Sequence, residues 1–361
     1  MSVQRAPRWI FCVFLALGVR AGAVEPLPAP NAPSVTRTPT EPRVVLLWPT
    51  ENRALAEGRP QDYYQPTISK RVISGMFGFV RSNLPEPPPY FERFHEGIDI
   101  QPVRRDENGI PLDPVRAAAA GKVAYTNTVA SRSNFGLYII LEHVYGPYKA
   151  YTTYGHLARI SVSPGQEVAA GDPIGILGHT GNVDGRSRAH LHFEFGFLFN
   201  DDFDSWFKKY AEPAEGKNIH GCFNGNNLFG VDPARLLMET QEGHPPTLRQ
   251  VLEREKPLFR VALPATDGLT FWQKQFPFMT EPAPPGVKVE SWLVDCNRIG
   301  IPLRFRPSVL KVGKPEVVWF DEKVTLQQSF SRGLVEKHQG RRCLTERTGQ
   351  KWASLLLWRA E

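Results

Sequence analysis

The chain lacks the features that mark disulfide-rich, membrane-spanning or nucleic-acid-binding proteins. Its 361 residues include only four cysteines, too few for a scaffold held together by disulfides. No apolar run reaches the roughly 20 residues that a membrane span needs, so no membrane span is expected. Lysine and arginine (43) exceed aspartate and glutamate (37), but no block of five like charges occurs, and nucleic acid is not an expected partner. A phosphate-binding glycine loop and a helical His-Glu-x-x-His zinc motif are also absent.

What is present is an ordinary globular composition with an excess of proline. Hydrophobic residues make up 41% of the chain and charged residues 22%, which excludes wholesale disorder. The length suggests two or three domains. The 33 prolines exceed the usual share of about 5%, so stiff linkers and turns are expected.

The N-terminus has the pattern of an export signal. Arg5 and Arg8 precede an eleven-residue apolar run, Trp9–Val19, which ends shortly before the small residues Ala21-Gly22-Ala23. This pattern predicts a signal peptide over 1–23 and an extracytoplasmic location: periplasm, cell envelope or secreted. An N-terminal anchor that is never cut has the same charge and apolar pattern, and it stays open as the alternative.

Changes in composition predict three further regions. A proline-rich tether and N-terminal extension is expected over 24–70. Short apolar runs separated by glycine turns predict a mainly β domain over 71–242, with helices at 202–210 and from Asp232 onward. A second, small β domain is expected over 245–361, with its strands at 258–263, 287–294, 301–305, 317–320 and 353–358.

Three short segments bring together the residues that could do chemistry. They are His95 with Asp99, His156, and His190 with His192. Because alternate residues of a strand share a face, His190 and His192 should point to one side and Leu191 and Phe193 to the other, into the core. Two imidazoles side by side are costly to bury without a metal or a polar network.

A catalytic zinc site needs three protein ligands and an open position for water. His95, Asp99 and one of the two paired histidines would supply those ligands. His156 and the other paired histidine would then lie nearby as bases. The spacing alone does not assign the two histidines.

The order of these motifs resembles the lysostaphin/LytM-type zinc endopeptidases, which cut peptidoglycan. The resemblance covers about 71–237. Besides the histidine motifs it rests on a glycine-rich first strand at 72–79, a hairpin at 114–123, glycine-rich turns at 165–181 and a closing motif at 231–233.

The resemblance implies a mainly β fold, an antiparallel sheet with short helices, to which the small C-terminal β domain is added. It implies that His95, Asp99 and His192 bind Zn²⁺ and that His156 and His190 are the catalytic pair. The implied function is hydrolysis of peptide bonds in peptidoglycan stems or cross-bridges through a zinc-activated water. An insertion at 197–228 departs from the family pattern and should border the cleft.

Other interpretations remain. Some relatives that have lost metal ligands regulate other wall hydrolases without catalysis, although this chain keeps all five residues. His220 and Cys222 could instead form a thiol protease pair. For the C-terminal β domain a wall or protein partner is a hypothesis, and core packing is the preferred role of its tryptophans. Cys296 and Cys343 are the preferred disulfide pair.

Overall fold

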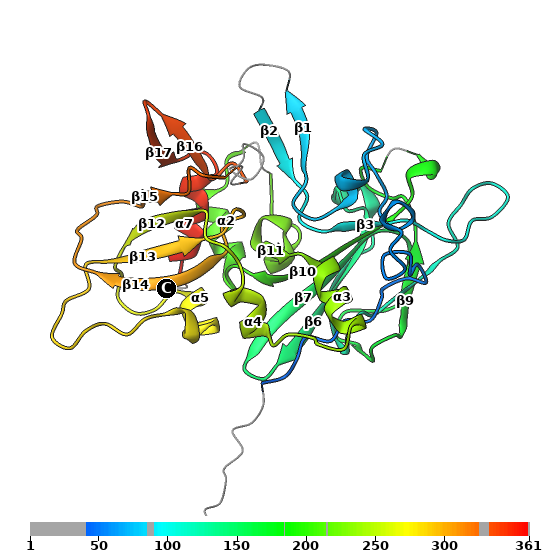
Figure 1. Cartoon of the computed structure of the whole chain (residues 1–361), viewed down its shortest axis with the longest axis horizontal. Helices are drawn as coiled ribbons and strands as arrows, with labels where there is room; N and C mark the ends of the chain where they lie inside the picture. Colours follow the sequence, from blue (N-terminus) through cyan, green and yellow to red (C-terminus); the bar gives the residue numbers. More distant parts are fainter. Residues whose placement is uncertain (1–40, 85–89, 184, 214–215, 325–331, 360–361) are drawn as a thin grey trace, which may run out of the picture. The chain divides into compact units, whose positions relative to one another are not determined.

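The computed structural model describes residues 41–84, 90–183, 185–213, 216–324 and 332–359 (Figure 1). The predicted signal peptide at 1–23 and the tether up to residue 40 lie outside these residues. The strands are β1 (Val80–Leu84), β2 (Tyr90–Phe94), β3 (Ile98–Ile100), β4 (Pro114–Arg116), β5 (Gly121–Asn127), β6 (Leu137–Tyr145), β7 (Tyr148–Ile160), β8 (Glu167–Val168), β9 (Pro173–Leu177), β10 (Leu191–Leu198), β11 (Leu228–Val231), β12 (Phe259–Pro264), β13 (Ser291–Cys296), β14 (Pro302–Ser308), β15 (Glu316–Phe320), β16 (Val335–His338) and β17 (Arg341–Leu344).

Short helices connect these strands. The α-helices are α1 (Pro60–Tyr63), α2 (Phe203–Tyr210), α3 (Pro233–Gln241), α4 (Leu248–Glu253), α5 (Phe271–Gln275) and α7 (Gly349–Leu357). The 3-10 helices are η1 (Val72–Gly75), η2 (Ala130–Arg132), η3 (Arg186–Arg188), η5 (Gly221–Phe223), η6 (Gly225–Asn227) and η7 (Pro277–Met279). Both expected helices, α2 and α3, are confirmed, and α3 has Asp232 as its N-cap and proline at its first position. Within the described residues no helix combines the length and the apolar character needed to cross a membrane.

A nine-stranded sheet forms the larger part of the fold. Its main path runs β11-β10-β7-β6-β5-β8, and β3, β4 and β9 join it at the side. Every pairing in it is antiparallel, so the expected fold class is confirmed. Strand β10 pairs with β3, β7 and β11, which places it well inside the sheet. The backbone of β10 is therefore fixed by hydrogen-bonded strands on both sides.

The residues of β10 explain its place in the sheet. Seven of its eight residues are buried, and Leu191, Phe193 and Phe195 are fully inaccessible. Strands covered on both faces tend to be apolar throughout. Leu191 and Phe193 pack into the core opposite His190 and His192, as the alternation predicted.

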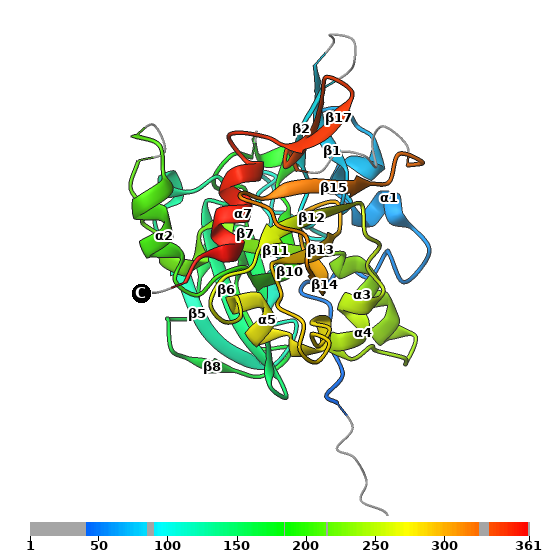
Figure 2. The same ribbon diagram turned by 90° about the vertical axis from the view of Figure 1, so that its left-hand side faces the viewer.

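A second, four-stranded antiparallel sheet follows, in the order β14-β13-β12-β15 (Figure 2). The expected strand at 353–358 is wrong, because residues 353–357 belong to α7. A short apolar run does not by itself distinguish a strand from a helix. Trp352, Ala353, Leu355 and Leu356 are buried, a spacing that places them along one side of a helix.

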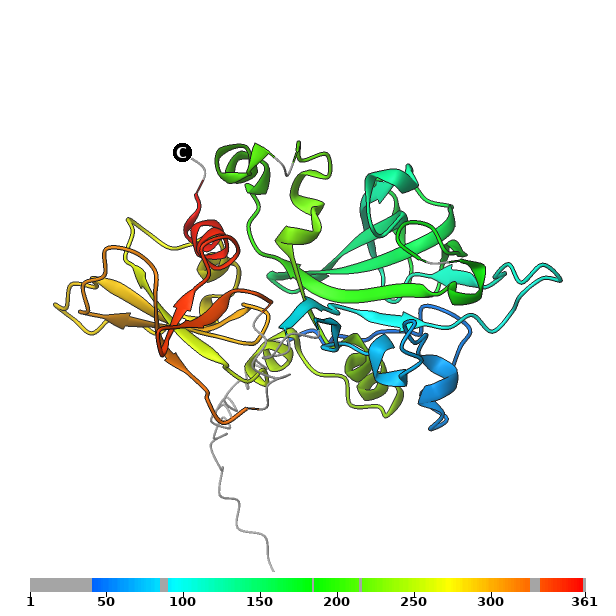
Figure 3. The ribbon, with the colours of Figure 1, turned by 90° about the horizontal axis from the view of Figure 1, so that it is seen from above.

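The two sheets are separate groups of strands (Figure 3), but their side chains share one hydrophobic core. The ring of Phe199, which follows β10, lies 5.7 Å from that of Trp272 and 6.1 Å from that of Trp352. Asn200 Nδ2 donates hydrogen bonds to the carbonyls of Leu355 and Trp358, both 3.0 Å away. Residues 41–361 accordingly form one compact unit.

Three finer expectations are wrong. Residues 72–75 form η1 rather than the start of a glycine-rich strand. The segments at 114–123 are not a hairpin, since β4 pairs with β9 while β5 pairs with β6 and β8. Cys296 and Cys343 form no disulfide; Cys296 is buried as a free thiol and Cys343 is a free thiol at the surface.

Candidate metal and catalytic site

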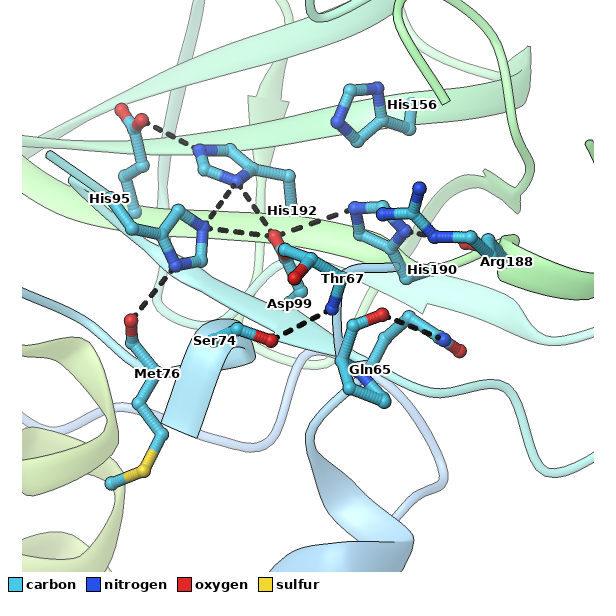
Figure 4. Close-up of polar contacts among 12 residues, drawn as sticks. Gln65, Thr67, Ser74, Met76, His95, Asp99, His156, Arg188, His190 and His192 are labelled. Atoms are coloured by element: carbon cyan, nitrogen blue, oxygen red, sulfur yellow. Dashed lines mark hydrogen bonds and ion pairs between the residues drawn. The ribbon is translucent and has the colours of Figure 1, made fainter. Parts of the chain in front are cut away.

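The sheet brings the predicted residues together through its register. Asp99 in β3 and Gly155 in β7 lie on either side of His192 in β10. His156 follows Gly155, and His190 lies one residue before β10. His95 lies between β2 and β3. All five side chains lie in one group (Figure 4), and each of them is at least 95% buried.

Three ligand-type atoms converge at the centre of this group (Figure 4). Asp99 Oδ1 lies 3.0 Å from His95 Nε2 and 3.0 Å from His192 Nδ1. The two nitrogens are 3.3 Å apart. Atoms that bind one tetrahedral zinc ion at 2.0–2.1 Å lie about 3.3 Å from one another. The spacing therefore suits one ion bound by all three.

The hydrogen bonds behind these rings orient the ligand atoms. His95 Nδ1 lies 2.9 Å from the carbonyl of Met76, and His192 Nε2 lies 2.7 Å from Glu194 Oε1. A carbonyl and a carboxylate can only accept, so these ring nitrogens donate. In the neutral rings the lone pairs of His95 Nε2 and His192 Nδ1 then face Asp99. Three acceptors that face one another favour a cation between them.

The carboxylates around His192 also favour a cation at this place. Burial alone would lower its pKa, but the bonds to Asp99 and Glu194 raise the pKa to about 9. Burial opposes the ionisation of Glu194, yet its contacts with His192 lower the pKa of that carboxyl. The carboxylates thus attract positive charge to His192, and a divalent cation bound here would supply it in place of a proton.

His156 and His190 form a second pair beside the three ligand-type residues. Their ring centroids are 4.8 Å apart. His156 Nδ1 donates to the carbonyl of Thr180 (2.8 Å), and His190 Nδ1 donates to that of Arg188 (2.7 Å). In the neutral form of either ring, Nε2 then carries the lone pair. His190 Nε2 is buried, lies 3.4 Å from Asp99 Oδ1, and has no hydrogen-bond partner among the described residues.

A distortion of β7 directs His156 into this group. Between Tyr154 and Leu157 strand β7 contains one residue more than the matching part of β6, which is a β-bulge. His156 adopts a φ of 61°, a left-handed conformation uncommon for residues other than glycine. Bulges turn side chains out of the regular alternation, often beside active sites. Burial, and then the nearby rings of His190 and His192, hold the pKa of His156 well below its ordinary value, so its ring is neutral near pH 7.

Gly97 lets the chain segment that contains His95 approach β10 closely. A Cβ atom at this position would lie 2.5 Å from the carbonyl oxygen of Phe193, 2.8 Å from Glu194 Cγ and 3.0 Å from His192 Cε1. Real Cβ contacts do not reach such distances, so only glycine fits without a shift of the backbone. The close packing of His95 against His192 depends on this glycine.

The site opens into a cleft of about 630 Å³. Its walls carry Phe94, His95, Glu96, Arg132, Ser133, Asn134, Phe135, Tyr138, His156, Asn182, His192, Glu194, His220, Asn224, Gly225, Asn226, Leu228 and Arg332. The insertion at 197–228 borders the cleft, as expected. The ring of Phe135 stacks on that of His192 with centroids 5.0 Å apart.

Comparison with known proteins agrees with this arrangement. Residues 93–201 match the model of peptidase family M23. Residues 93–201 are thus similar to a peptidase family M23 domain. The matched range includes both ligand segments and the strand with His156. The resemblance to the lysostaphin/LytM-type peptidases is confirmed.

Individual relatives match over parts of the chain. The chain is 37% identical over 82 residues to the peptidoglycan DD-endopeptidase ShyA of Vibrio cholerae, which is 22% of this chain and 17% of that protein. A zinc-containing peptidase from V. cholerae is 25% identical, with 42% of this chain and 37% of that chain covered and a TM-score of 0.29. The lysostaphin catalytic domain from Staphylococcus simulans is 22% identical, with 45% and 90% covered and a TM-score of 0.27. The chain thus spans less than a fifth of ShyA.

Outside the five residues of the M23 site, the alternative thiol pair does not form. The tyrosine hydroxyls of Tyr125 and Tyr138 lie 2.9 and 3.1 Å from His220 Nδ1, and His220 Nε2 donates to the carbonyl of Arg132. Cys222 Sγ donates instead to the carbonyl of Asp201, and burial raises the pKa of its thiol. Both nitrogens of His220 are thus occupied, so His220 does not act as the base of Cys222.

Sequence reasoning missed three residues that lie beside the five predicted ones. Glu194 continues the alternation of His190 and His192, so the spacing placed it on the same face, but it received no role. Phe135 and Arg332 carried no signal, because only the fold brings them to the cleft. Arg332 lies 140 residues beyond His192 in the sequence.

Proposed function

We propose that the chain is an exported zinc metalloendopeptidase that hydrolyses peptide bonds in peptidoglycan stems or cross-bridges. The observation that carries this proposal is the convergence of three metal-ligand atoms beside two further histidines whose Nε2 lone pairs face the same site. Metallopeptidase chemistry needs this combination of a metal site and adjacent bases.

His95 Nε2, Asp99 Oδ1 and His192 Nδ1 would hold the zinc ion. Two imidazoles and a carboxylate are a donor set of catalytic zinc sites, which leave a position open. When bound, the ion supplies a Lewis acid that polarises a peptide carbonyl and acidifies water. Glu194 orients the His192 ring and increases its basicity through the bond to Nε2.

His156 and His190 would move the proton during hydrolysis. A neutral imidazole can accept a proton from the attacking water, and the resulting imidazolium can give it to the leaving amine. The carbonyls of Thr180 and Arg188 hold each ring by Nδ1, so each ring keeps Nε2 towards the reacting groups. As an imidazolium, either ring would also stabilise the developing oxyanion.

The substrate class rests on the similarity to ShyA and on the cleft. ShyA is described as a peptidoglycan DD-endopeptidase. The cleft is lined by polar side chains such as Asn134, Asn182 and Asn226, which can bond to the backbone of an extended peptide. Together with the predicted signal peptide, this supports a location outside the cytoplasm, where such a substrate would lie.

The test is digestion of purified peptidoglycan by the purified protein, with the products identified by mass. Soluble fragments that carry a new amino terminus at one peptide bond are expected, and a zinc chelator should abolish their release. The His190→Ala variant serves as the inactive control. A protein that binds the wall, holds no zinc and releases nothing would instead be the non-enzymatic regulator.

A further inference from the structure

Two arginines from the C-terminal part of the chain contact the two neighbours of His95. The guanidinium of Arg298 lies over the ring of Phe94, 4.7 Å from its centroid. The guanidinium of Arg332 forms an ion pair with Glu96, with 2.8 Å between Nη2 and Oε1. The two sequence neighbours of His95, the first proposed metal ligand, are thus both contacted by arginines from the region after residue 245.

The contact of Arg332 is well defined. Its guanidinium also lies over the ring of Phe229 in β11, 4.5 Å from the centroid. The side chains of Arg332 and Glu96 are only 19% and 20% exposed, which reduces the screening of their attraction by water. Arg332 adopts a φ of 54°, so its backbone takes a conformation that non-glycine residues rarely adopt. This strained backbone position is the one from which an arginine side chain reaches Glu96.

Arg298 supports the other side of the same segment. It is mostly buried, and this burial lowers the pKa of its guanidinium. It lies close to Gly78, where a Cβ would be 3.5 Å from Arg298 Nη1. Gly78 N donates to the carbonyl of His95, and His95 N donates to the carbonyl of Phe79. Arg298 therefore packs against both chain segments that position His95.

His95 needs such support because no strand contains it. Strand β2 ends at Phe94 and β3 begins at Ile98, so no continuous ladder fixes His95 as it fixes His192. Metal ligands must be held to within about 0.5 Å, and the residues that surround them supply that precision.

We propose that Arg298 and Arg332 are positioning residues through which the C-terminal region holds the first ligand of the metal site. This inference rests on the proposed zinc site at His95, Asp99 and His192. It assigns the C-terminal region a role in metal affinity, separate from any role in wall binding.

The test measures zinc affinity of the full chain by competition with a chelator, together with the melting temperature. Arg332→Ala and Arg298→Ala should each weaken zinc binding by about 10-fold, the lower end of the effect of residues that orient ligands. At saturating zinc, kcat of Arg332→Ala should recover towards wild type. Arg332→Lys keeps the charge without the planar stacking, so it should lose less affinity than Arg332→Ala.

Arg342→Ala is the matched control. Arg342 also belongs to the C-terminal region, pairs with Glu322 at 2.7 Å and lies 3.9 Å from the ring centroid of Phe320, but it contacts no residue of the site. This variant should bind zinc as wild type does. Equal zinc affinities for Arg332→Ala, Arg298→Ala and Arg342→Ala would overturn the inference.

A charge exchange separates positioning from general damage to the fold. Arg332→Glu should weaken zinc binding, and the double variant Arg332→Glu with Glu96→Arg should recover part of the loss. No recovery, with the melting temperature unchanged, would contradict the role of the ion pair. If the wild-type protein itself binds no zinc, the proposed function fails; if it binds zinc and the variants match it, only this inference fails.

Discussion

The two chain segments that would hold the metal are built in different ways. His192 lies in β10, a strand paired on both sides, and its neighbours Leu191 and Phe193 are fully buried. His95 lies between two strands; its ring bonds to the Met76 carbonyl, and its sequence neighbours Phe94 and Glu96 contact Arg298 and Arg332. One ligand is positioned by sheet periodicity, the other by tertiary contacts. Changes on β10 should therefore act directly on the metal, while changes near His95 should act through packing.

The largest effect is expected from His192→Ala. Loss of a ligand should lower zinc affinity by more than the roughly 100-fold that loss of an orienting residue can cause, and activity should fall to background. Equilibrium dialysis against a chelator measures the affinity. His244→Ala, at an exposed histidine far from the site, is the control and should bind zinc normally.

His190→Ala should separate the roles of the two neighbouring histidines, His190 and His192. Zinc content should stay stoichiometric, because Nε2 of His190 is not among the three converging ligand atoms. Turnover should fall by about 10²- to 10⁴-fold, the usual contribution of a general acid or base. Equal retention of zinc by His190→Ala and His192→Ala would contradict the division into ligand and base.

Glu194→Gln should have an intermediate effect on β10. The amide can still accept from His192 Nε2, but the negative charge that strengthens this ligand is lost. Zinc affinity should fall by about 10-fold, with little change in melting temperature. Glu142→Gln on β6 is the control, because Glu142 bonds to Lys149 and Tyr151 outside the site. An unchanged zinc affinity would show that the charge of Glu194 does not support metal binding.

Gly97→Ala tests the packing that brings the two segments together. Its Cβ would contact backbone and side-chain atoms of β10, so His95 and His192 would have to move apart. The free energy of unfolding should fall by about 1–3 kcal/mol, as for other overpacked sites, and zinc affinity should fall with it. Denaturant unfolding gives the first quantity. Gly313→Ala has no atom within 4 Å of the new Cβ and should change neither.

The smallest effect is expected from Cys222→Ser. His220 does not act as the base of Cys222, so kcat/KM should stay within about twofold of wild type, as for a surface change. Rates of peptidoglycan digestion measure this. A large loss of activity would instead indicate that the Cys222 thiol takes part in catalysis.

Much of the site followed from residue spacing, and the fold class from the short apolar runs. The alternation of His190, Leu191, His192 and Phe193 correctly predicted a shared polar face and a buried one, because strand geometry imposes a period of two. The strand predicted at 353–358 is wrong, because a short apolar run is compatible with both a strand and a helix. The wrong disulfide and the wrong hairpin share a cause: both required knowledge of which distant segments are neighbours.

By itself, the sequence determined the chemical groups available at the site and the side of β10 on which two of them lie. Only the tertiary structure decided that Asp99 pairs beside His192, that a bulge turns His156 inward and that Arg332 reaches Glu96. Local periodicity follows from backbone geometry, which each short segment carries within it. Contacts between distant segments depend instead on how the whole core packs, and no short segment contains that information.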